Sequence, residues 1–207
     1  MSHYFIENKA LLTDERTLEL DIFDTGFKFL TNNGLFSCDK IDDASVTMLK
    51  NLPPLSGTLL DLGCGYGVLG ITLAKKYSLS LTMADVNGIA LDYATRNAKI
   101  NGVHSNAVLT NCFDNITDIY DNIVLNPPIH AGKDIMYRMY EEAARHLTHS
   151  GSLYIVIYKK HGAESTIIKL QEIYDNVNVL YKKKGCYVVQ ATYTANDLLK
   201  RESCYDE

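Results

Sequence analysis

Hydrophobic residues recur with two different periods along this chain, and the changes of period divide it into strands and helices. Short apolar runs, typical of buried strands, alternate with longer segments in which apolar residues return every three or four positions, as on one helix face. The expected strands are 58–62, 79–85, 107–109, 121–125, 152–158, 177–181 and 186–193. The expected helices between them are 67–76, 88–101, 133–147 and 162–174. This alternation predicts an α/β fold with a parallel sheet.

Both ends of this pattern refine the expected fold. The last two strands are close together in sequence and predict an antiparallel hairpin, so the seven-stranded, mostly parallel sheet has an antiparallel last strand. Before the first core strand, the alternation in Thr17–Phe23, the apolar run Phe27–Leu30 and the turn signal Asn32–Gly34 predict a small hairpin. Asp42 or Asp43 then caps a short helix. We therefore expect an N-terminal extension packed on the core, a main domain and a polar tail, at 1–57, 58–196 and 197–207.

Composition narrows the class of protein. The 207 residues suit one α/β domain, and 46% hydrophobic residues is ordinary for a globular chain. No apolar run approaches the roughly 20 residues of a membrane span, and the N-terminus lacks a signal-peptide pattern. The five cysteines include no Cys-x-x-Cys pair, which favours free thiols in a reducing compartment over a disulfide framework or a zinc site. We expect a cytoplasmic monomer without a membrane anchor or a metal.

Charge bears on a nucleic-acid partner. The net charge is −5, whereas phosphate binding favours a basic surface. The lysines are unevenly distributed, however, with clusters at Lys159–Lys160 and Lys182–Lys184. Each cluster taken alone is more typical of a solvated turn than of a binding site.

A glycine-rich loop follows the strand at 58–62. Its glycines permit positive φ and let backbone N–H groups approach a ligand, and the next helix directs its positive end to the same place. We therefore expect a cofactor loop at the carboxyl end of this strand. Gly65-x-Gly67-x-x-Gly70 matches the dinucleotide pattern, whereas Asp61-x-Gly63-x-Gly65-x-Gly67 resembles motif I of class I S-adenosylmethionine (SAM) methyltransferases. The second pattern accounts for Gly63, which lies directly after the strand.

The loops after the next two strands supply further candidates. Asp85 ends the second core strand, where a carboxylate can accept hydrogen bonds from both hydroxyls of an adenosine ribose; an Asp beside a helix start is the structural alternative. Asn111, Cys112 and Phe113 follow the third strand. In the methyltransferase arrangement this loop meets the adenine; alternatively it is a turn with Phe113 in the core.

Asn126-Pro127-Pro128 follows the fourth strand and decides between the two cofactor patterns. A residue before proline is held extended, so Asn126 is rigid. Its side-chain oxygen and the Pro127 carbonyl can both accept hydrogen bonds from one amino group. An amine with a delocalised lone pair can then pyramidalise and attack a methyl sulfonium, without a metal or covalent intermediate. Hydride transfer to a nicotinamide has no use for this arrangement.

The same stretch resembles motif IV of amino-methyltransferases, and Asn126–Gly132 is similar to a segment of the small-subunit ribosomal RNA guanine-N2 methyltransferases. Gly34–Ser37, Asp39–Asp42, Asp85–Asn87, Asn97 and Asn101 also resemble segments of that family, and the similarity extends over 26–192. The resemblance implies a Rossmann-like class I methyltransferase fold, SAM as cofactor, and guanine N2 of 16S ribosomal RNA, free or in the small subunit, as substrate. The family often has a second, N-terminal half, and we expect a single-domain form.

The resemblance also assigns residues to roles. The expected catalytic residues are Asn126, Pro127 and Pro128. The expected cofactor-binding residues are Asp61, Gly63, Cys64, Gly65, Gly67, Asp85, Val86, Asn111, Cys112 and Asn126. The expected substrate-binding residues are Phe36, Ile129, His130 and Gly132.

The chain departs from the family at Ile129, where Phe or Tyr usually stacks on a flipped base. Phe36, Tyr66 or His130 could supply the aromatic face instead. His130 could orient the substrate or relay a proton, or it could be a solvent-facing loop histidine. The competing functions are a protein-glutamine methyltransferase, a non-catalytic SAM-binding protein and, last, a dehydrogenase.

Overall fold

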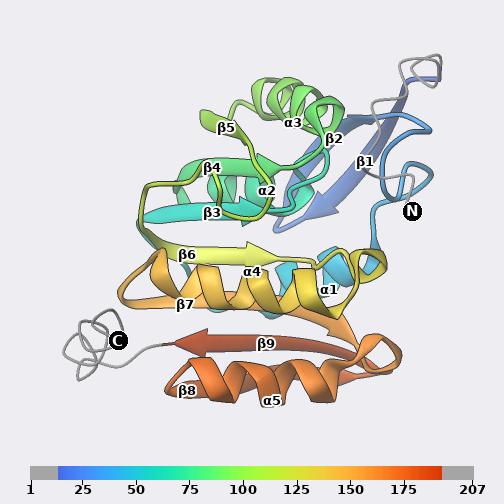
Figure 1. Cartoon of the computed structure of the whole chain (residues 1–207). Coiled ribbons are helices and arrows are strands. Elements are labelled where there is room, and N and C mark those ends of the chain that lie inside the picture. Colours follow the sequence, from blue (N-terminus) through green and yellow to red (C-terminus); the bar gives the residue numbers. More distant parts are fainter. Residues whose placement is uncertain (1–13, 193–207) are drawn as a thin grey trace.

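The chain folds around a seven-stranded sheet with helices on both faces and a separate two-stranded hairpin (Figure 1). The structure, a computed structural model, describes residues 14–192. The strands are β1 (Arg16–Ile22), β2 (Thr25–Thr31), β3 (Thr58–Leu62), β4 (Ser80–Asp85), β5 (Ser105–Leu109), β6 (Tyr120–Leu125), β7 (Leu147–Tyr158), β8 (Asn176–Lys183) and β9 (Cys186–Thr192). The helices are α1 (Asp43–Asn51), α2 (Val68–Tyr77), α3 (Gly88–Ile100), α4 (Lys133–Arg145) and α5 (Ala163–Ile173), with short 3₁₀ turns η3 (Ile129–Ala131) and η4 (Lys159–His161).

The strand order of the large sheet is β5-β4-β3-β6-β7-β9-β8. β3 pairs in parallel with both β4 and β6, while β9 runs antiparallel to both of its neighbours. The predicted fold, with its antiparallel last strand, is confirmed. The direction of winding reverses between β3 and β6, and ligands of open α/β sheets bind outside the carboxyl ends of strands at such a reversal. The loops after β3 and β6 leave the sheet at this edge, on the right in Figure 1.

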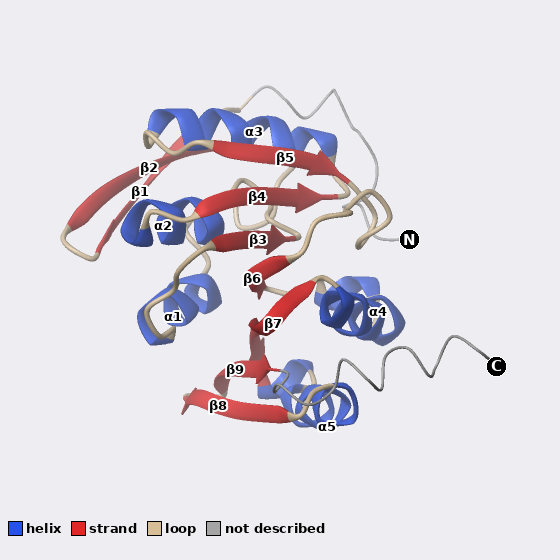
Figure 2. Ribbon diagram, turned by 90° about the vertical axis from the view of Figure 1, so that its left-hand side faces the viewer, coloured by secondary structure: helices blue, strands red, loops and turns tan. Residues whose placement is uncertain are grey.

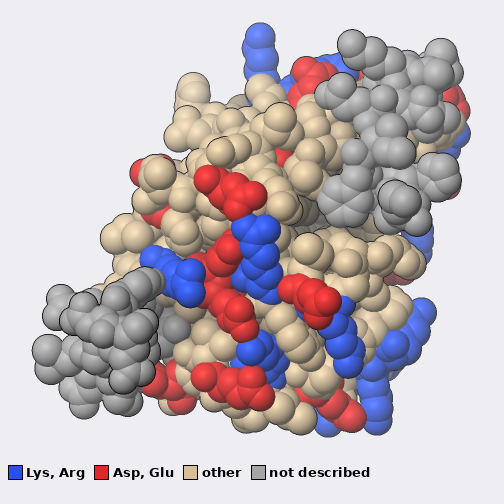
Figure 3. Space-filling model, viewed as in Figure 1, with Lys and Arg blue, Asp and Glu red and all other residues tan. Residues whose placement is uncertain are grey.

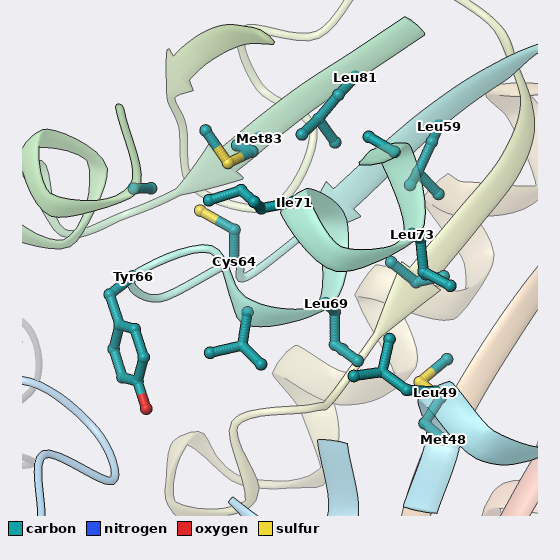
Figure 4. Close-up of a cluster of buried hydrophobic side chains, with 14 of the residues drawn as sticks. Met48, Leu49, Leu59, Cys64, Tyr66, Leu69, Ile71, Leu73, Leu81 and Met83 are labelled. Atoms are coloured by element: carbon teal, nitrogen blue, oxygen red, sulfur yellow. The ribbon is translucent and has the colours of Figure 1, made fainter. Parts of the chain in front are cut away.

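Two hydrophobic cores fill the space on either side of the sheet. Figure 2 shows α1, α2 and α3 on one face and α4 and α5 on the other. Successive side chains of a strand point to opposite faces, so Leu59 belongs to the first core, whereas Leu60 and Leu62 belong to the second. Figure 4 shows part of the first core, in which Leu59 lies near Leu73 and Leu81. Both faces of β3 are therefore buried, and its carboxyl end has a rigid support.

The β1–β2 hairpin is attached to α3 by two asparagines one helical turn apart. Asn97 Oδ1 accepts from the Leu30 N–H at 2.7 Å, and its Nδ2 donates to the carbonyls of Leu30 and Tyr66, each at 2.9 Å. Asn101 Oδ1 accepts from the Lys28 N–H at 3.1 Å and its Nδ2 donates to the Lys28 carbonyl at 2.7 Å. The side-chain amides thus pair with the edge of β2 as a neighbouring strand would.

Most boundaries shift by a few residues at most, and two features differ more from the sequence-based expectation. The hairpin is confirmed, but its turn lies at Phe23 and Asp24, both with φ of 56°, and not at Asn32–Gly34. Of these two residues only Asp commonly adopts a positive φ, so residue propensities do not indicate a turn at this position. β7 begins at Leu147 and not at the expected residue 152. Leu147 pairs with Tyr120 of β6 before the apolar run of the strand begins.

Some expectations fall outside what the structure decides. The division of the chain after residue 57 stays a prediction. The expected polar tail at 197–207 lies outside the described residues. Within residues 14–192, no helix combines the length and apolar character needed to cross a membrane.

Candidate active site at the carboxyl edge of the sheet

A cavity of about 290 Å³ lies beside the loops that follow β3, β4, β5, β6 and β7. Its size is near the lower end of the range for small-molecule sites. It brings together most residues expected from the sequence: Phe36, Asp61, Gly63, Cys64, Gly65, Asp85, Val86, Asn111, Cys112, Asn126, Pro127, Pro128, Ile129 and His130. Gly67 and Gly132 do not line it, and both have positive φ at the start of a helix, α2 and α4 respectively.

The glycine loop after β3 has a backbone that L side chains rarely adopt. Gly63, Gly65 and Gly67 have φ of 68°, 55° and 93°. The N–H groups of Gly63 and Cys64 both donate to the Ala84 carbonyl, at 2.8 and 3.0 Å, which fixes the loop to the end of β4. A Cβ on Gly65 would meet no atom within 4 Å, so the space beside this cavity-lining glycine is open.

Asp85 connects this loop to the start of α3. Its Oδ2 accepts from the Gly65 N–H at 2.8 Å and its Oδ1 from the Asn87 N–H at 2.9 Å. Burial raises the pKa of the carboxyl group, and the backbone N–H groups of Asn87 and Gly65 oppose that rise. Asn87 itself caps α3 by accepting from Ile89 and Ala90. Asp85 therefore occupies the helix-start position, and the ribose-binding role that the sequence offered as the other alternative stays a prediction.

Asp61 lies beneath the glycine loop and is buried. Its Oδ2 accepts from the Gly70 N–H at 2.8 Å, which ties β3 to the first turn of α2. Burial raises the pKa of Asp61 to about 7, and the Gly70 hydrogen bond opposes this. A Cβ on Gly70 would lie 2.8 Å from Leu81 and 2.9 Å from Asp61. Close packing therefore accounts for Gly70, the third glycine of the dinucleotide pattern.

The loop after β5 resolves the two roles left open for Phe113. Asn111 and Cys112 line the cavity. Phe113 turns away from it, is 5% exposed, and stacks on His146 with ring centroids 4.6 Å apart. Phe113 is thus a core residue, and the adenine-packing alternative is wrong for this side chain.

Asn126 is held by the N-terminus of α1, a contact that joins residues 84 positions apart. Its Nδ2 donates to Asp42 Oδ2 at 2.9 Å and to Ser45 Oγ at 3.1 Å. The NH₂ group of the amide therefore faces the N-terminus of α1. Within residues 14–192 no hydrogen bond is made to its Oδ1, which stays available as an acceptor in a side chain that lines the cavity.

The sequence offered three residues as possible stacking surfaces for a base, namely Phe36, Tyr66 and His130. The three side chains differ in exposure and in setting. Phe36 is 50% exposed. Tyr66 is 4% exposed, donates to the Ser37 carbonyl at 3.2 Å and packs edge-on against Phe29, so it forms a wall. His130 is exposed on η3 beside the half-buried Ile129.

Sequence reasoning missed several residues that line the cavity. Among them, Asp42 and Ser45 come from the N-terminus of α1, and Tyr158 and His161 come from the end of β7 and from η4. The capping pattern identified Asp42 as a helix start, but no local signal linked α1 to the loop after β6. Within residues 14–192, no group of three or more His, Cys, Asp or Glu side chains is arranged to hold a metal ion.

An open α/β sheet with a glycine loop after β3, an acid at the end of β4 and Asn-Pro-Pro after β6 defines a Rossmann-like methyltransferase. The chain belongs to the family described as methyltransferase small domain, whose profile matches residues 26–190.

The chain is similar to proteins of known sequence over different shares of its length. The uncharacterized protein YbxB of Bacillus subtilis (strain 168) is 36% identical over 195 residues, which cover 91% of this chain and 97% of that protein. The ribosomal RNA small subunit methyltransferase C of Aeromonas hydrophila is 39% identical over 138 residues, covering 64% of this chain and 40% of that protein. The chain thus spans less than half the length of that ribosomal RNA methyltransferase.

A solved structure shares the fold. The T. thermophilus 16S rRNA N2 G1207 methyltransferase, in complex with AdoMet and guanosine, superposes with a TM-score of 0.78 at 24% identity. The match covers 86% of this chain and 50% of that chain.

Proposed function

We propose that this protein is a cytoplasmic SAM-dependent N-methyltransferase that acts on guanine N2 in 16S ribosomal RNA. The observation that carries the proposal is the setting of Asn126, whose Nδ2 is engaged by α1 while its Oδ1 stays free beside the glycine loop. The relatives named for small-subunit ribosomal RNA methylation support the substrate. The free thiols of Cys38, Cys64, Cys112 and Cys186 support a reducing compartment.

The residues of the cavity fit SAM. The loop from Gly63 to Gly67 offers backbone N–H groups and open space at Gly65, and Asp85 can accept from ribose hydroxyls. Asn111 and Cys112 would lie beside the adenine. When bound, SAM supplies an electrophilic methyl group on a sulfonium. The carboxyl group of Asp85 beside this cavity favours a cationic ligand when it is ionised.

Asn126 and Pro127 would then select the nucleophile. An exocyclic amine is a double donor, and Asn126 Oδ1 with the Pro127 carbonyl would accept one hydrogen bond from each of its N–H groups. Holding both hydrogens turns the nitrogen lone pair toward the methyl group, and the same acceptors stabilise the positive charge that grows on nitrogen during transfer. An oxygen or carbon nucleophile could not use both acceptors.

Phe36 and Ile129 would hold the base. Phe36 is the exposed aromatic of the rim, so it would take the stacking role that Ile129 cannot fulfil. Ile129 would pack on the base through its aliphatic surface, and His130 beside it would contact the base edge or the backbone. Gly132, which the family comparison assigned to substrate binding, would serve through the turn that ends η3.

Lysines distant in sequence converge beside this rim. The Lys159 N–H donates to the Gly185 carbonyl at 2.7 Å, which joins η4 to the β8–β9 turn and brings Lys159–Lys160 next to Lys182–Lys184. Figure 3 shows basic side chains at the lower right, where β8 ends in Figure 1. Because His161 of η4 lines the cavity, we propose that this lysine edge contacts phosphates flanking the target nucleotide.

Methyl transfer from labelled SAM tests the proposal. Purified protein would be incubated with small ribosomal subunits, free 16S ribosomal RNA and peptide release factors, followed by mass spectrometry of nucleosides and peptides. Formation of N2-methylguanosine in the RNA would support the proposal. Label only on a protein glutamine would establish the competing function, and NADH binding without SAM binding would exclude both.

A further inference from the structure

Asp42 is the centre of a small hydrogen-bond network beside the proposed catalytic residue. One of its carboxylate oxygens, Oδ2, accepts from the Ser45 N–H at 2.8 Å, from the Ser45 hydroxyl at 3.0 Å and from Asn126 Nδ2 at 2.9 Å. The first of these contacts caps α1. The last crosses from the N-terminal extension to the loop after β6.

This network decides which end of the Asn126 amide is available. A side-chain amide presents either its oxygen or its NH₂ group, and the two orientations have nearly the same shape. A carboxylate has no hydrogen to donate, so only the NH₂ end of Asn126 can face Asp42. Ser45 Oγ lies 3.0 Å from the same carboxylate oxygen and directs its hydrogen there, so toward Asn126 it acts as an acceptor as well.

We propose that Asp42 is a positioning residue for methyl transfer, which fixes the Asn126 amide with Oδ1 directed to the substrate amine. This inference rests on the proposed function of Asn126. The negative charge on Asp42 has a second consequence, because it polarises the amide and makes its oxygen a stronger acceptor for a nitrogen that becomes positive. Neither effect requires Asp42 to touch substrate or cofactor.

The arrangement also links catalysis to the N-terminal extension. Asp42 is held in place as the N-cap of α1, and α1 packs on β7. The Asn126 amide is therefore fixed only when α1 is docked. A core lacking α1 would keep the glycine loop and Asp85 but would lose the orientation of its catalytic amide.

The test needs a substitution that preserves the helix cap and removes the bridge. Asp42→Ser keeps a favoured N-cap residue while its shorter side chain cannot reach Asn126. Asp43→Ser is the matched control, because Asp43 lies next in the chain, carries the same charge and pairs with Lys40 at 2.6 Å instead. Circular dichroism and thermal unfolding would establish that both variants are folded.

The first readout is the Asn126 side-chain NH₂ signal in ¹⁵N NMR spectra, which does not depend on activity. We expect its proton exchange to be slow in the wild type and in Asp43→Ser and about tenfold faster or more in Asp42→Ser. Equal exchange in Asp42→Ser and the wild type would overturn the inference, whether or not the protein methylates RNA. Absent methylation by the wild type would instead contradict the proposed function.

The second readout is kinetic and uses small subunits and labelled SAM in single-turnover reactions. Asp42→Ser should lower the rate of transfer about tenfold and leave SAM affinity unchanged, whereas Asp43→Ser should change neither quantity. In an Asn126→Ala background, Asp42→Ser should change the remaining rate less than about twofold, because the group it orients is gone. The same fold loss in both backgrounds would show that Asp42 acts independently of Asn126 and would overturn the inference.

Discussion

The two walls of the cavity are held in different ways. The proposed cofactor wall, comprising the Gly63–Gly67 loop and Asp85–Asn87, is fixed by backbone hydrogen bonds and by glycines with positive φ. The proposed substrate wall, comprising Phe36, η3 and η4, consists largely of side chains on short turns, several of them exposed. Asn126 lies between the walls and is held by α1.

This difference indicates that cofactor binding and substrate recognition depend on different kinds of contact. A cofactor common to a whole fold can be bound by backbone geometry, which tolerates change in side chains. Recognition of one nucleotide in a large RNA needs particular side chains on loops, which vary without disturbing the sheet. Substitutions in each wall should therefore separate SAM binding from RNA recognition, and changes between the walls should affect only the rate.

The largest expected effect concerns Asp61, which is buried beneath the cofactor wall. The pKa of Asp61 is raised from 3.8 to about 7, so the folded protein retains a proton that the unfolded chain has released. The stability from this proton is complete below the unfolded pKa and is lost as pH rises through about 7. Between about pH 5 and pH 8 the free energy of unfolding should fall by about 2–3 kcal/mol from this group.

Urea denaturation of the wild type and Asp61→Asn across this pH range would measure that contribution. An asparagine can still accept a hydrogen bond from the Gly70 N–H, but it does not titrate. The free energy of unfolding should therefore fall less steeply with pH in the variant. Parallel curves for the two proteins would show that Asp61 is ionised throughout and that its surroundings are more polar than the structure indicates.

Asn126→Ala should affect only the chemical step. It removes an acceptor that acts mainly in the transition state, so the rate of methyl transfer should fall about 100-fold or more. Calorimetric titration should find SAM affinity nearly unchanged. Near-normal turnover would mean that Asn126-Pro127-Pro128 is only a turn.

Asp85→Ala should weaken SAM binding by about 1.5–3 kcal/mol, the usual size of a lost hydrogen bond to a charged group. The substitution also frees the N–H groups of Gly65 and Asn87, so part of the loss will come from a looser loop. Asp85→Asn retains an acceptor and is the matched variant. If both variants bind SAM as tightly as the wild type, Asp85 has only its structural role.

Phe36→Ala tests the substrate wall. Loss of stacking on the base should raise the KM for small subunits about tenfold and leave SAM affinity unchanged, while Phe36→Tyr should restore the wild-type value. Ile129→Phe would add a second stacking surface and should compensate for Phe36→Ala. A change in SAM affinity in Phe36→Ala would show that the two walls are not separable.

The smallest expected effect concerns the lysine edge. Replacing Lys182, Lys183 and Lys184 by alanine should lower methylation of subunits a few-fold. The loss should be smaller at higher salt, because the release of counterions then contributes less free energy to binding. Lys28→Ala, on the hairpin and paired with Glu19, controls for loss of positive charge alone. An equal effect from both changes would remove the lysine edge from the site.

The backbone of the glycine loop was more predictable than the rest of the site, for a physical reason. The spacing of Gly63, Gly65 and Gly67 indicates positions that need a positive φ. This requirement is local, so it can be recognised from the sequence before the fold is known. Gly70 was ambiguous because packing and ligand approach both demand glycine, and only the distances to Leu81 and Asp61 separate them. The element order was likewise local and was confirmed.

Contacts between distant segments were not predictable. Nothing near Asp42 indicates that its carboxylate meets Asn126, and nothing near Lys159 indicates its bond to Gly185. Phe113 looked equally suited to core and ligand, because both environments are apolar. The Phe23–Asp24 turn was missed since its geometry is imposed by the pairing of β1 with β2.

We propose that the free oxygen of Asn126 directs methyl transfer to a guanine amine of the small ribosomal subunit. The most direct test of this role is nucleoside mass spectrometry of 16S ribosomal RNA from cells that lack this protein, complemented with either the wild type or Asn126→Ala. We expect one N2-methylguanosine to be lost in the deletion strain, restored by the wild type and not by Asn126→Ala. Unchanged guanine methylation in the deletion strain, with loss of methylation on a protein glutamine, would contradict the claim.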